Sequence, residues 1–245
     1  MNREAVGIKG FDILVQGGLL PGRVYILAGP PGSGKTTFGT QFLANGAKHG
    51  QCGVFLTMNE STDTIIDDMS QYSFGVPGFI KLNKLHFVDL GPMREYGYFE
   101  RPENYRAADY ETEEDAPSPR YVYEKIQEYI EKYDAKRIVI DSVSCIHFSS
   151  DDSAKQGKSV SRFIRNLKNL GCTTILLSEM TNPNAYTIEH FASHGVIFMH
   201  NFFDPSKNTM TRAVQVIKMR GTRHDCDMRT VEFSNDGIVV KGKIA

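Results

Sequence analysis

The sequence predicts an α/β fold in which helices flank a mostly parallel central sheet and an antiparallel extension follows at the C-terminal end. Short apolar runs alternate with helical patterns, as is typical of parallel strands joined by right-handed crossovers. The predicted strands of this part are residues 24–28, 53–57, 137–141 and 173–178, and the predicted helices are residues 36–47, 61–71, 120–133 and 153–170. Four further strand-like runs follow at residues 195–199, 211–219, 229–233 and 237–241. We expect these four to be antiparallel additions to one edge of the sheet.

The length and composition favour one cytoplasmic domain. With 245 residues, the chain suits one large α/β core over residues 1–245. Lys and Arg total 28 against 29 for Asp and Glu, so the net charge of −1 provides no general attraction to nucleic acid or to an anionic membrane. The four widely spaced cysteines fit reduced thiols, and the sequence has neither a signal-peptide pattern nor the ~18 consecutive apolar residues of a membrane span. We therefore expect a soluble, cytoplasmic protein.

Residues 91–119 differ from the rest of the chain in composition. They contain four prolines and an acidic stretch at 109–115. A loop of this length is usually either functional or disordered. Net acidity combined with proline disfavours packing, so we predict a mobile surface insertion rather than an element that binds a partner.

The segment Gly29–Thr36 carries a phosphate-binding motif. It reads GPPGSGKT, matches G-x-x-x-x-G-K-[ST] at every fixed position, and lies between a predicted strand and a predicted helix. The glycines let backbone N–H groups converge on a β-phosphate, the Lys35 ammonium neutralises phosphate oxygens, and the Thr36 hydroxyl is a ligand for Mg²⁺. A glycine-rich turn with an exposed lysine is the alternative, which the flanking strand and helix disfavour. The residues predicted to bind ATP or ADP here are Gly29, Pro30, Pro31, Gly32, Ser33, Gly34, Lys35, Thr36 and Thr37.

A second motif ends the predicted strand at 137–141. Its apolar run finishes in Asp141, which is the Walker B arrangement. Ligands of open α/β sheets bind outside the carboxyl ends of the strands, so this carboxylate is expected within reach of a Mg²⁺ bound to Thr36. An apolar run that ends in aspartate is by itself common and mostly structural. The upstream phosphate motif makes Asp141 a predicted nucleotide-site and metal-site residue.

With both motifs in place, the sequence resembles the KaiC/RadA branch of the RecA-like ATPases over nearly the whole chain. The segments that carry the resemblance are residues 8–12, 17–19, 29–36, 41–46, 139–142 and 218–224. The last of them reads KMRGTRH, and K-x-R-G-T-x-H in a late strand is a KaiC-type feature that generic P-loop proteins lack. The resemblance implies a RecA-like P-loop NTPase fold.

The resemblance also implies roles for residues 218–224. Lys218 and Arg220 are expected to reach the γ-phosphate bound by a neighbouring subunit, where cationic side chains offset the charge on the transferring phosphoryl group. Thr222 and His224 of the same motif are expected to bind the nucleotide. Residues that act between subunits need an oligomer, so we expect a homo-oligomer, such as a hexamer. The alternative is a solvated strand edge, where lysine protects against aggregation.

The resemblance is weaker at the general base. KaiC-like domains end their second strand with two glutamates that orient and deprotonate the attacking water, whereas this sequence reads Asn59-Glu60. Glu60 is the candidate base, because the amide of Asn59 cannot accept a proton. If the first position is the essential one, the protein binds ATP and hydrolyses it very slowly. Ser178 and Glu179 match polar residues of the family at a later strand end, and they are candidate sensors of the γ-phosphate or simply a strand end.

The function predicted from these residues is slow, Mg²⁺-dependent ATP hydrolysis in which the nucleotide state regulates assembly or partner binding. Two alternatives stay open. One is a scaffold that binds ATP without hydrolysing it, and the other is a recombinase-like ATPase that binds DNA. RecA relatives bind DNA through basic loops, and the corresponding stretch 151–158 holds two lysines beside two aspartates and no aromatic side chain for stacking. Nucleic acid is therefore the less favoured partner.

Overall fold

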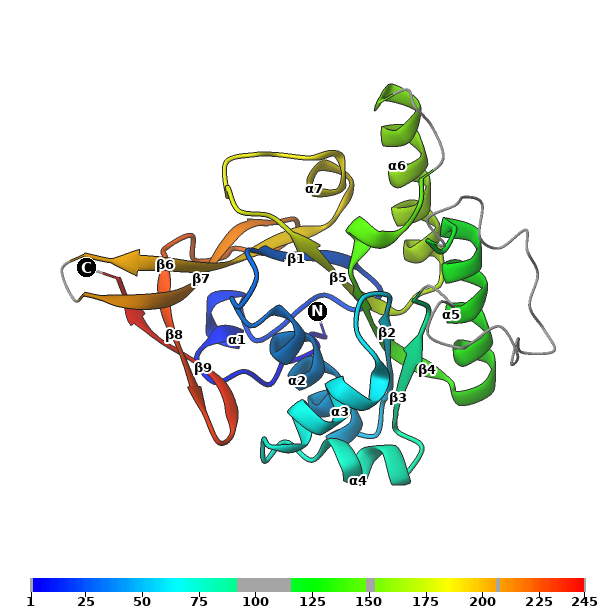
Figure 1. Ribbon diagram of the computed structural model, residues 1–245, viewed down its shortest axis with the longest axis horizontal. Coiled ribbons are helices and arrows are strands. Elements are labelled where there is room, and N and C mark those ends of the chain that lie inside the picture. Colours follow the sequence, from blue (N-terminus) through cyan, green and yellow to red (C-terminus); the bar gives the residue numbers. More distant parts are fainter. Residues whose placement is uncertain (1, 92–115, 149–152, 206–207, 245) are drawn as a thin grey trace.

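The computed structural model describes residues 2–91, 116–148, 153–205 and 208–244. Within these residues, nine strands form one sheet in the order β3-β2-β4-β5-β1-β6-β7-β8-β9. The strands are β1 (Val24–Gly29), β2 (Cys52–Thr57), β3 (Leu85–Asp89), β4 (Ala135–Asp141), β5 (Thr173–Glu179), β6 (Gly195–Asp204), β7 (Thr209–Met219), β8 (Arg229–Ser234) and β9 (Gly237–Lys243). The helices are α1 (Phe11–Leu14), α2 (Lys35–Lys48), α3 (Thr62–Ser70), α4 (Val76–Lys81), α5 (Pro119–Tyr133), α6 (Ser153–Asn169) and α7 (Ile188–Ala192). The predicted mixed α/β sheet is confirmed (Figure 1).

The C-terminal strands differ from the prediction in one respect. β6 pairs parallel with β1, whereas β7, β8 and β9 are antiparallel to their neighbours. The prediction that all four late strands add antiparallel was therefore wrong for β6. The segment between β5 and β6, which contains α7, is a crossover, and such a connection is what parallel strands require.

Sequence patterns did not predict α1, β3 and α4. His86 interrupts the apolar residues of β3, and α4 contains Pro77 and Gly78. Neither segment therefore shows a regular hydrophobic periodicity. Pro119, the last residue of the predicted insertion, is instead the first residue of α5, whose N-cap Ser118 accepts a hydrogen bond from the Tyr121 N–H. Most of the predicted mobile segment, residues 92–115, lies outside the described residues.

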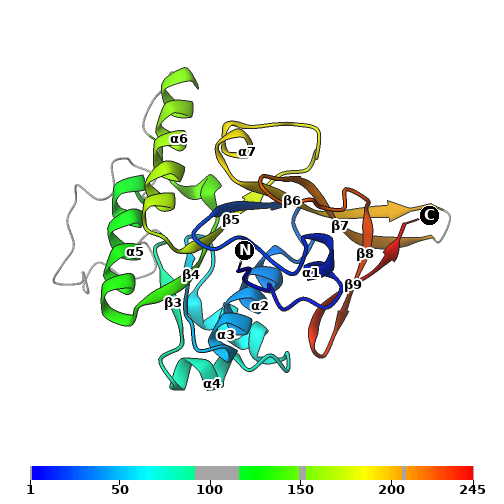
Figure 2. The ribbon, with the colours of Figure 1, turned by 180° about the vertical axis from the view of Figure 1, so that it is seen from behind.

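Alternating residues of the central strands pack into two separate hydrophobic layers. On β1, Tyr25 and Leu27 pack with α2, α3 and α4, whereas Val24 and Ile26 pack with α5 and α6. Figures 1 and 2 show these two groups of helices covering opposite faces of the sheet. No helix among the described residues is both long enough and apolar enough to cross a membrane.

A buried arginine joins the N-terminal segment to this core. Arg137 on β4 is 3% exposed and donates hydrogen bonds to the backbone oxygens of Ala5 and Phe42, at 2.9 and 2.8 Å, and to Gln51. Its guanidinium also lies over the Phe42 ring, 4.6 Å from the ring centroid. Three separate parts of the chain therefore share one cationic side chain.

Replacing this arginine by an apolar residue is expected to destabilise the fold. Arg137→Leu leaves the buried oxygens of Ala5 and Phe42 without their donor, which costs about 2–4 kcal/mol of unfolding free energy. Urea denaturation measures this loss. The neighbouring, exposed Lys136 is the control, and Lys136→Ala should change the unfolding free energy by less than about 0.5 kcal/mol. Equal stabilities of the two variants would contradict the prediction.

Candidate functional site

The phosphate motif forms the turn between β1 and α2. β1 ends at Gly29, and α2 begins at Lys35 directly after Gly34, whose φ of 100° requires glycine. The Lys35 ammonium donates to the backbone oxygens of Gly29 and Pro30, at 2.9 and 3.1 Å. The N-terminus of a 14-residue helix thus lies at the carboxyl edge of the sheet, which is a favourable position for an anion.

Asp141 meets the motif at this edge. The Thr36 hydroxyl donates to the Asp141 carboxylate, with Oγ1 and Oδ2 3.0 Å apart. Burial raises the pKa of Asp141, and the Thr36 hydrogen bond and the Lys35 charge oppose that rise. Burial likewise lowers the pKa of Lys35, against the attraction of Asp141 and Glu179. A hydroxyl and a carboxylate side by side provide oxygen ligands that suit Mg²⁺.

Two observations on the chain itself fit a phosphate and a cation here. The Oγ of Ser33, inside the loop, is buried without a hydrogen-bond partner, so a ligand oxygen or water would satisfy it. Among the described residues, no three His, Cys, Asp or Glu side chains gather into a metal-binding group. Mg²⁺ usually takes most of its ligands from phosphate and water, so the two oxygens of Thr36 and Asp141 would be enough to hold it.

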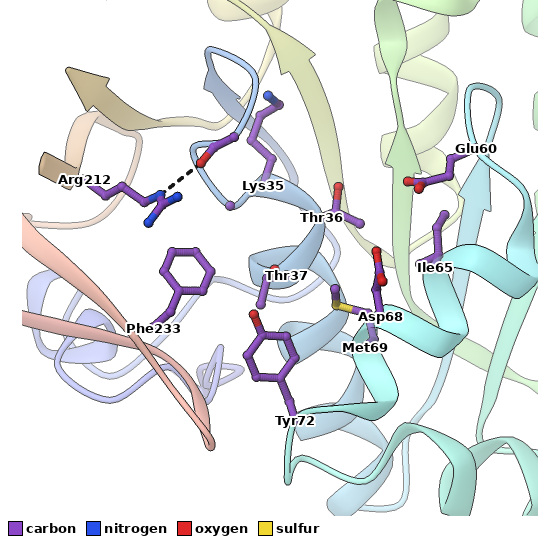
Figure 3. Close-up of a pocket in the computed structure, with 12 residues that line it drawn as sticks. Lys35, Thr36, Thr37, Glu60, Ile65, Asp68, Met69, Tyr72, Arg212 and Phe233 are labelled. Carbon is purple, nitrogen blue, oxygen red and sulfur yellow. Dashed lines mark hydrogen bonds between the residues drawn. The ribbon is translucent and has the colours of Figure 1, made fainter. Parts of the chain in front are cut away.

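A cavity of about 500 Å³ opens from the loop toward α3 and β8. Besides the loop, it is lined by Glu60 after β2, by four residues on or just after α3, and by one residue each of β7 and β8 (Figure 3). These further lining residues are Glu60, Ile65, Asp68, Met69, Tyr72, Arg212 and Phe233. The volume and the mixture of aromatic and polar walls are typical of a small-molecule site.

The other predicted residues of this edge also lie near the loop. Glu60 lines the cavity, and its charge contributes to the raised pKa of Asp141, as does the charge of Glu179. Ser178 is buried, and β5 pairs with β1 so that Glu179 lies opposite Gly29. The structure therefore brings these acidic groups to the carboxyl edge.

Asn59 has a neighbour that the sequence analysis missed. The Cys145 thiol, in the 3₁₀ turn Val143–Cys145 after β4, donates to Asn59 Oδ1, with the two atoms 2.8 Å apart. No spacing rule connects these residues, because their contact depends on β2 and β4 being neighbours in the sheet.

The residues predicted from the K-x-R-G-T-x-H motif lie at the opposite edge. Lys218 pairs with Val196 near the start of β6, and its ammonium donates to the backbone oxygens of His190 and Ser193. The Arg220 guanidinium donates to the backbone oxygen of Phe191. Because β7 runs antiparallel to β6, these side chains are far from the phosphate loop of their own chain.

Thr222 and His224 follow at the same opposite edge. The Thr222 hydroxyl accepts from Arg3, and His224 Nδ1 lies 3.1 Å from the Thr222 backbone oxygen. The structure therefore does not bring Thr222 or His224 to the phosphate loop of the same chain. Any contact of theirs with a nucleotide requires a second subunit.

A cationic cluster surrounds His194 at this edge. Burial lowers the pKa of His194 to about 4, assisted by the charges of Lys168, Arg23, Arg220 and Lys218. Burial together with Arg220 and Lys168 lowers the pKa of Lys218 to about 8. Each of the charged groups that perturb these two side chains is a cation, so the cluster favours an anionic partner. The sequence analysis missed Arg23 and Lys168. Their proximity to His194 depends on how the strands and helices pack in the folded chain.

The fold and this site define a RecA-type P-loop protein, with a phosphate-binding loop and a strand-end aspartate at one edge of a mixed sheet. Residues 5–244 match the family described as "ATPase: KaiC". The chain belongs to this KaiC-like ATPase family, as its sequence motifs predicted.

Similar proteins and a similar solved structure are also described as KaiC or KaiC-like. The chain is 32% identical over 241 residues to a circadian clock oscillator protein KaiC of Parathermosynechococcus lividus. The matched region covers 96% of this chain and 42% of that relative. The chain is 31% identical over 222 residues to the circadian clock protein KaiC3 of Synechocystis sp., covering 89% and 41%. It thus spans about two fifths of the length of these curated relatives. A KaiC-like protein of the hyperthermophilic archaeon Pyrococcus horikoshii OT3 has a crystal structure that matches with a TM-score of 0.78 and 29% identity, covering 98% of this chain and 99% of that one.

Proposed function

We propose that the protein is a Mg²⁺-dependent ATPase of low turnover, whose nucleotide state regulates its own assembly or the binding of a protein partner. The observation that carries the proposal is the Thr36–Asp141 hydrogen bond of 3.0 Å, in which Thr36 also lines the cavity of about 500 Å³. It joins the hydroxyl of the phosphate motif to the strand-end carboxylate in the arrangement that P-loop NTPases use. Family membership supports ATP as the ligand. We assign the protein to the cytoplasm, in keeping with its composition.

The loop residues have complementary tasks in this proposal. Backbone N–H groups at the start of α2 hold the phosphates, and Lys35 turns its ammonium from the Gly29 and Pro30 oxygens to the β and γ oxygens. Thr36 and Asp141 would hold Mg²⁺, which screens the charge on the phosphates when it is bound. The nucleoside part then lies in the cavity between α3 and β8.

Glu60 is the proposed general base, and Asn59 limits its efficiency. Glu60 lines the cavity beside the loop, and its carboxylate can accept the proton of an attacking water. Asn59 offers only an amide, whose oxygen already accepts from the Cys145 thiol. Ser178 and Glu179 are proposed to sense the γ-phosphate from the end of β5. Slow hydrolysis follows from this pair, because Asn59 stands where the family pattern has the first of two glutamates.

Single-turnover ATP hydrolysis tests the proposed base. We expect Glu60→Gln to lower the rate by about 10²-fold or more, because the amide cannot accept the proton, and Asn59→Glu to raise it. Lys35→Ala should weaken ATP binding by at least about tenfold, since its ammonium is lost from the phosphates. A Glu60→Gln rate equal to wild type would reject Glu60 as base. ATP binding without any phosphate release would favour the non-hydrolysing scaffold.

The opposite-edge cations are proposed to act on the nucleotide of a neighbouring subunit. Lys218 and Arg220 cannot reach the phosphate loop of their own chain, and they belong to a cluster that favours an anion. A head-to-tail contact between subunits places this edge against the next phosphate loop, with Thr222 and His224 toward the nucleotide. Repetition of that contact closes a ring, and we propose a homo-oligomer, such as a hexamer.

The pH dependence of turnover tests the role of Lys218. Its lowered pKa of about 8 means that the ammonium charge is lost as the pH rises through 8, so kcat/KM should fall above pH 8. Arginine keeps its charge, and Lys218→Arg should remove that fall. Light scattering with and without ATP and Mg²⁺ reports the oligomer in parallel. The same alkaline fall in both proteins would exclude Lys218 as its cause.

One observation favours a second candidate function, an ATPase that binds single-stranded nucleic acid. α6 has no acidic residue between Ser153 and Asn169, and its Arg162 and Arg165 are exposed. α7 packs beside α6, as the hydrogen bond from Lys168 Nζ to the Ala192 oxygen shows.

Two exposed rings lie on α7 and just before it, next to α6, where the sequence analysis did not place them. Lys218 and Arg220 donate to the backbone oxygen of one of them, Phe191. Tyr186 and Phe191 are 59% and 64% exposed, and their ring centroids are 6.2 Å apart. Cations beside exposed rings suit a strand of stacked bases. Of the stretch 151–158 considered from sequence, residues 151 and 152 lie outside the described residues.

Fluorescence anisotropy with a labelled single-stranded oligonucleotide tests this second function. If the surface binds it, affinity should fall steeply between about 50 and about 200 mM salt. Phe191→Ala should weaken it by about tenfold through lost stacking. Lys132, an exposed residue of α5, provides the control, and Lys132→Gln should leave the affinity unchanged. No binding at the lower salt would reject nucleic acid as a ligand.

A further inference from the structure

Two residues of the antiparallel part of the sheet donate hydrogen bonds to backbone oxygens of the phosphate loop. Arg212 on β7 donates from Nε to the Gly32 backbone oxygen, at 3.0 Å (Figure 3). Asn201 on β6 donates from Nδ2 to the Pro31 oxygen, at 3.4 Å. Asn201 and Arg212 lie directly opposite each other in the β6–β7 pairing, so both side chains project from the same face.

Arg212 is itself held in place by β8. Its guanidinium lies over the Phe233 ring, 5.0 Å from the ring centroid. Phe233 in turn packs against the loop at Gly34, where a Cβ would lie 2.5 Å from the ring atom Cζ. The long, exposed side chain of Arg212 is therefore held by two contacts, one with the Gly32 backbone oxygen and one with the Phe233 ring.

The planarity of the peptide bond makes these outward contacts relevant to the inward side of the loop. In a trans peptide the C=O of one residue and the N–H of the next point in opposite directions. Holding the Gly32 oxygen on the outside therefore turns the Ser33 N–H inward, where it makes a long bond of 3.3 Å to the Pro30 oxygen. The contact to the Pro31 oxygen orients the Gly32 N–H in the same way. These are the N–H groups that a P-loop directs at phosphate.

We infer that Arg212, assisted by Asn201, is a positioning residue of the phosphate loop, which fixes the peptide planes that present N–H groups to a bound polyphosphate. The inference rests on the proposed nucleotide site and adds to it a support that comes from β6 and β7. It assigns Arg212 a task that depends on its Nε–H donor and not on its charge.

Two substitutions of Arg212 separate the donor from the charge. Gln places an amide nitrogen at the chain position of Nε, so Arg212→Gln can still donate to the Gly32 oxygen without a positive charge. Arg212→Met has a similar length and offers neither donor nor charge. Arg212 is exposed, and the unfolding midpoint in urea should be the same for both variants and wild type.

The measurement is the affinity for Mg²⁺ with inorganic tripolyphosphate, which has no nucleoside to bind in the cavity between α3 and β8. We expect Arg212→Met to weaken binding by about tenfold and Arg212→Gln to stay within about twofold of wild type. Asn201→Leu should weaken binding by about threefold, since a longer neutral hydrogen bond is lost.

The outcomes distinguish this inference from the proposed function. If wild type binds ATP and tripolyphosphate but Gln and Met are equally weak, Arg212 acts through its charge and the inference fails. If neither variant differs from wild type, the support is unnecessary and the inference fails as well, while the ATP site stands. If wild type binds neither ligand, the proposed function and the inference fail together.

Discussion

The parallel register of the central strands is the constraint on which the whole site depends. Because β1, β4 and β5 are parallel neighbours, Gly29 at the end of β1 lies opposite Glu179 at the end of β5, and Asp141 ends β4 one strand further along. The phosphate loop, the acidic groups and the N-terminus of α2 consequently share one edge. A slip of this register by one residue would turn the strand-end side chains to the other face of the sheet.

Sequence alone was sufficient where the chemistry is local or follows from the direction of a strand. The loop Gly29–Thr36 is contiguous, and Asp141 could be placed because carboxyl ends of parallel strands meet. Arg212 and Phe233 could not be found in this way, because their place depends on the antiparallel pairing of β6, β7 and β8. The direction of β6 was mispredicted for a related reason: strand patterns carry no sign of direction.

The two edges of the sheet gather different ionisable groups. The carboxyl edge brings Glu60, Glu179 and the Lys35 ammonium close enough to Asp141 for their charges to act on its carboxylate. The other edge gathers cations around a histidine that burial and their charge keep neutral. The head-to-tail assembly proposed above would bring these two unlike edges together, as in a ring or a filament.

The support of the loop by Arg212 has a consequence for the order in which the molecule is made. Arg212 follows Gly32 by 180 residues, so a ribosome releases the phosphate loop long before it releases the strands that brace it. The nascent chain therefore carries its nucleotide motif without this support until Arg212 has been synthesised. The loop can gain this support only after β7 and β8 have joined the sheet.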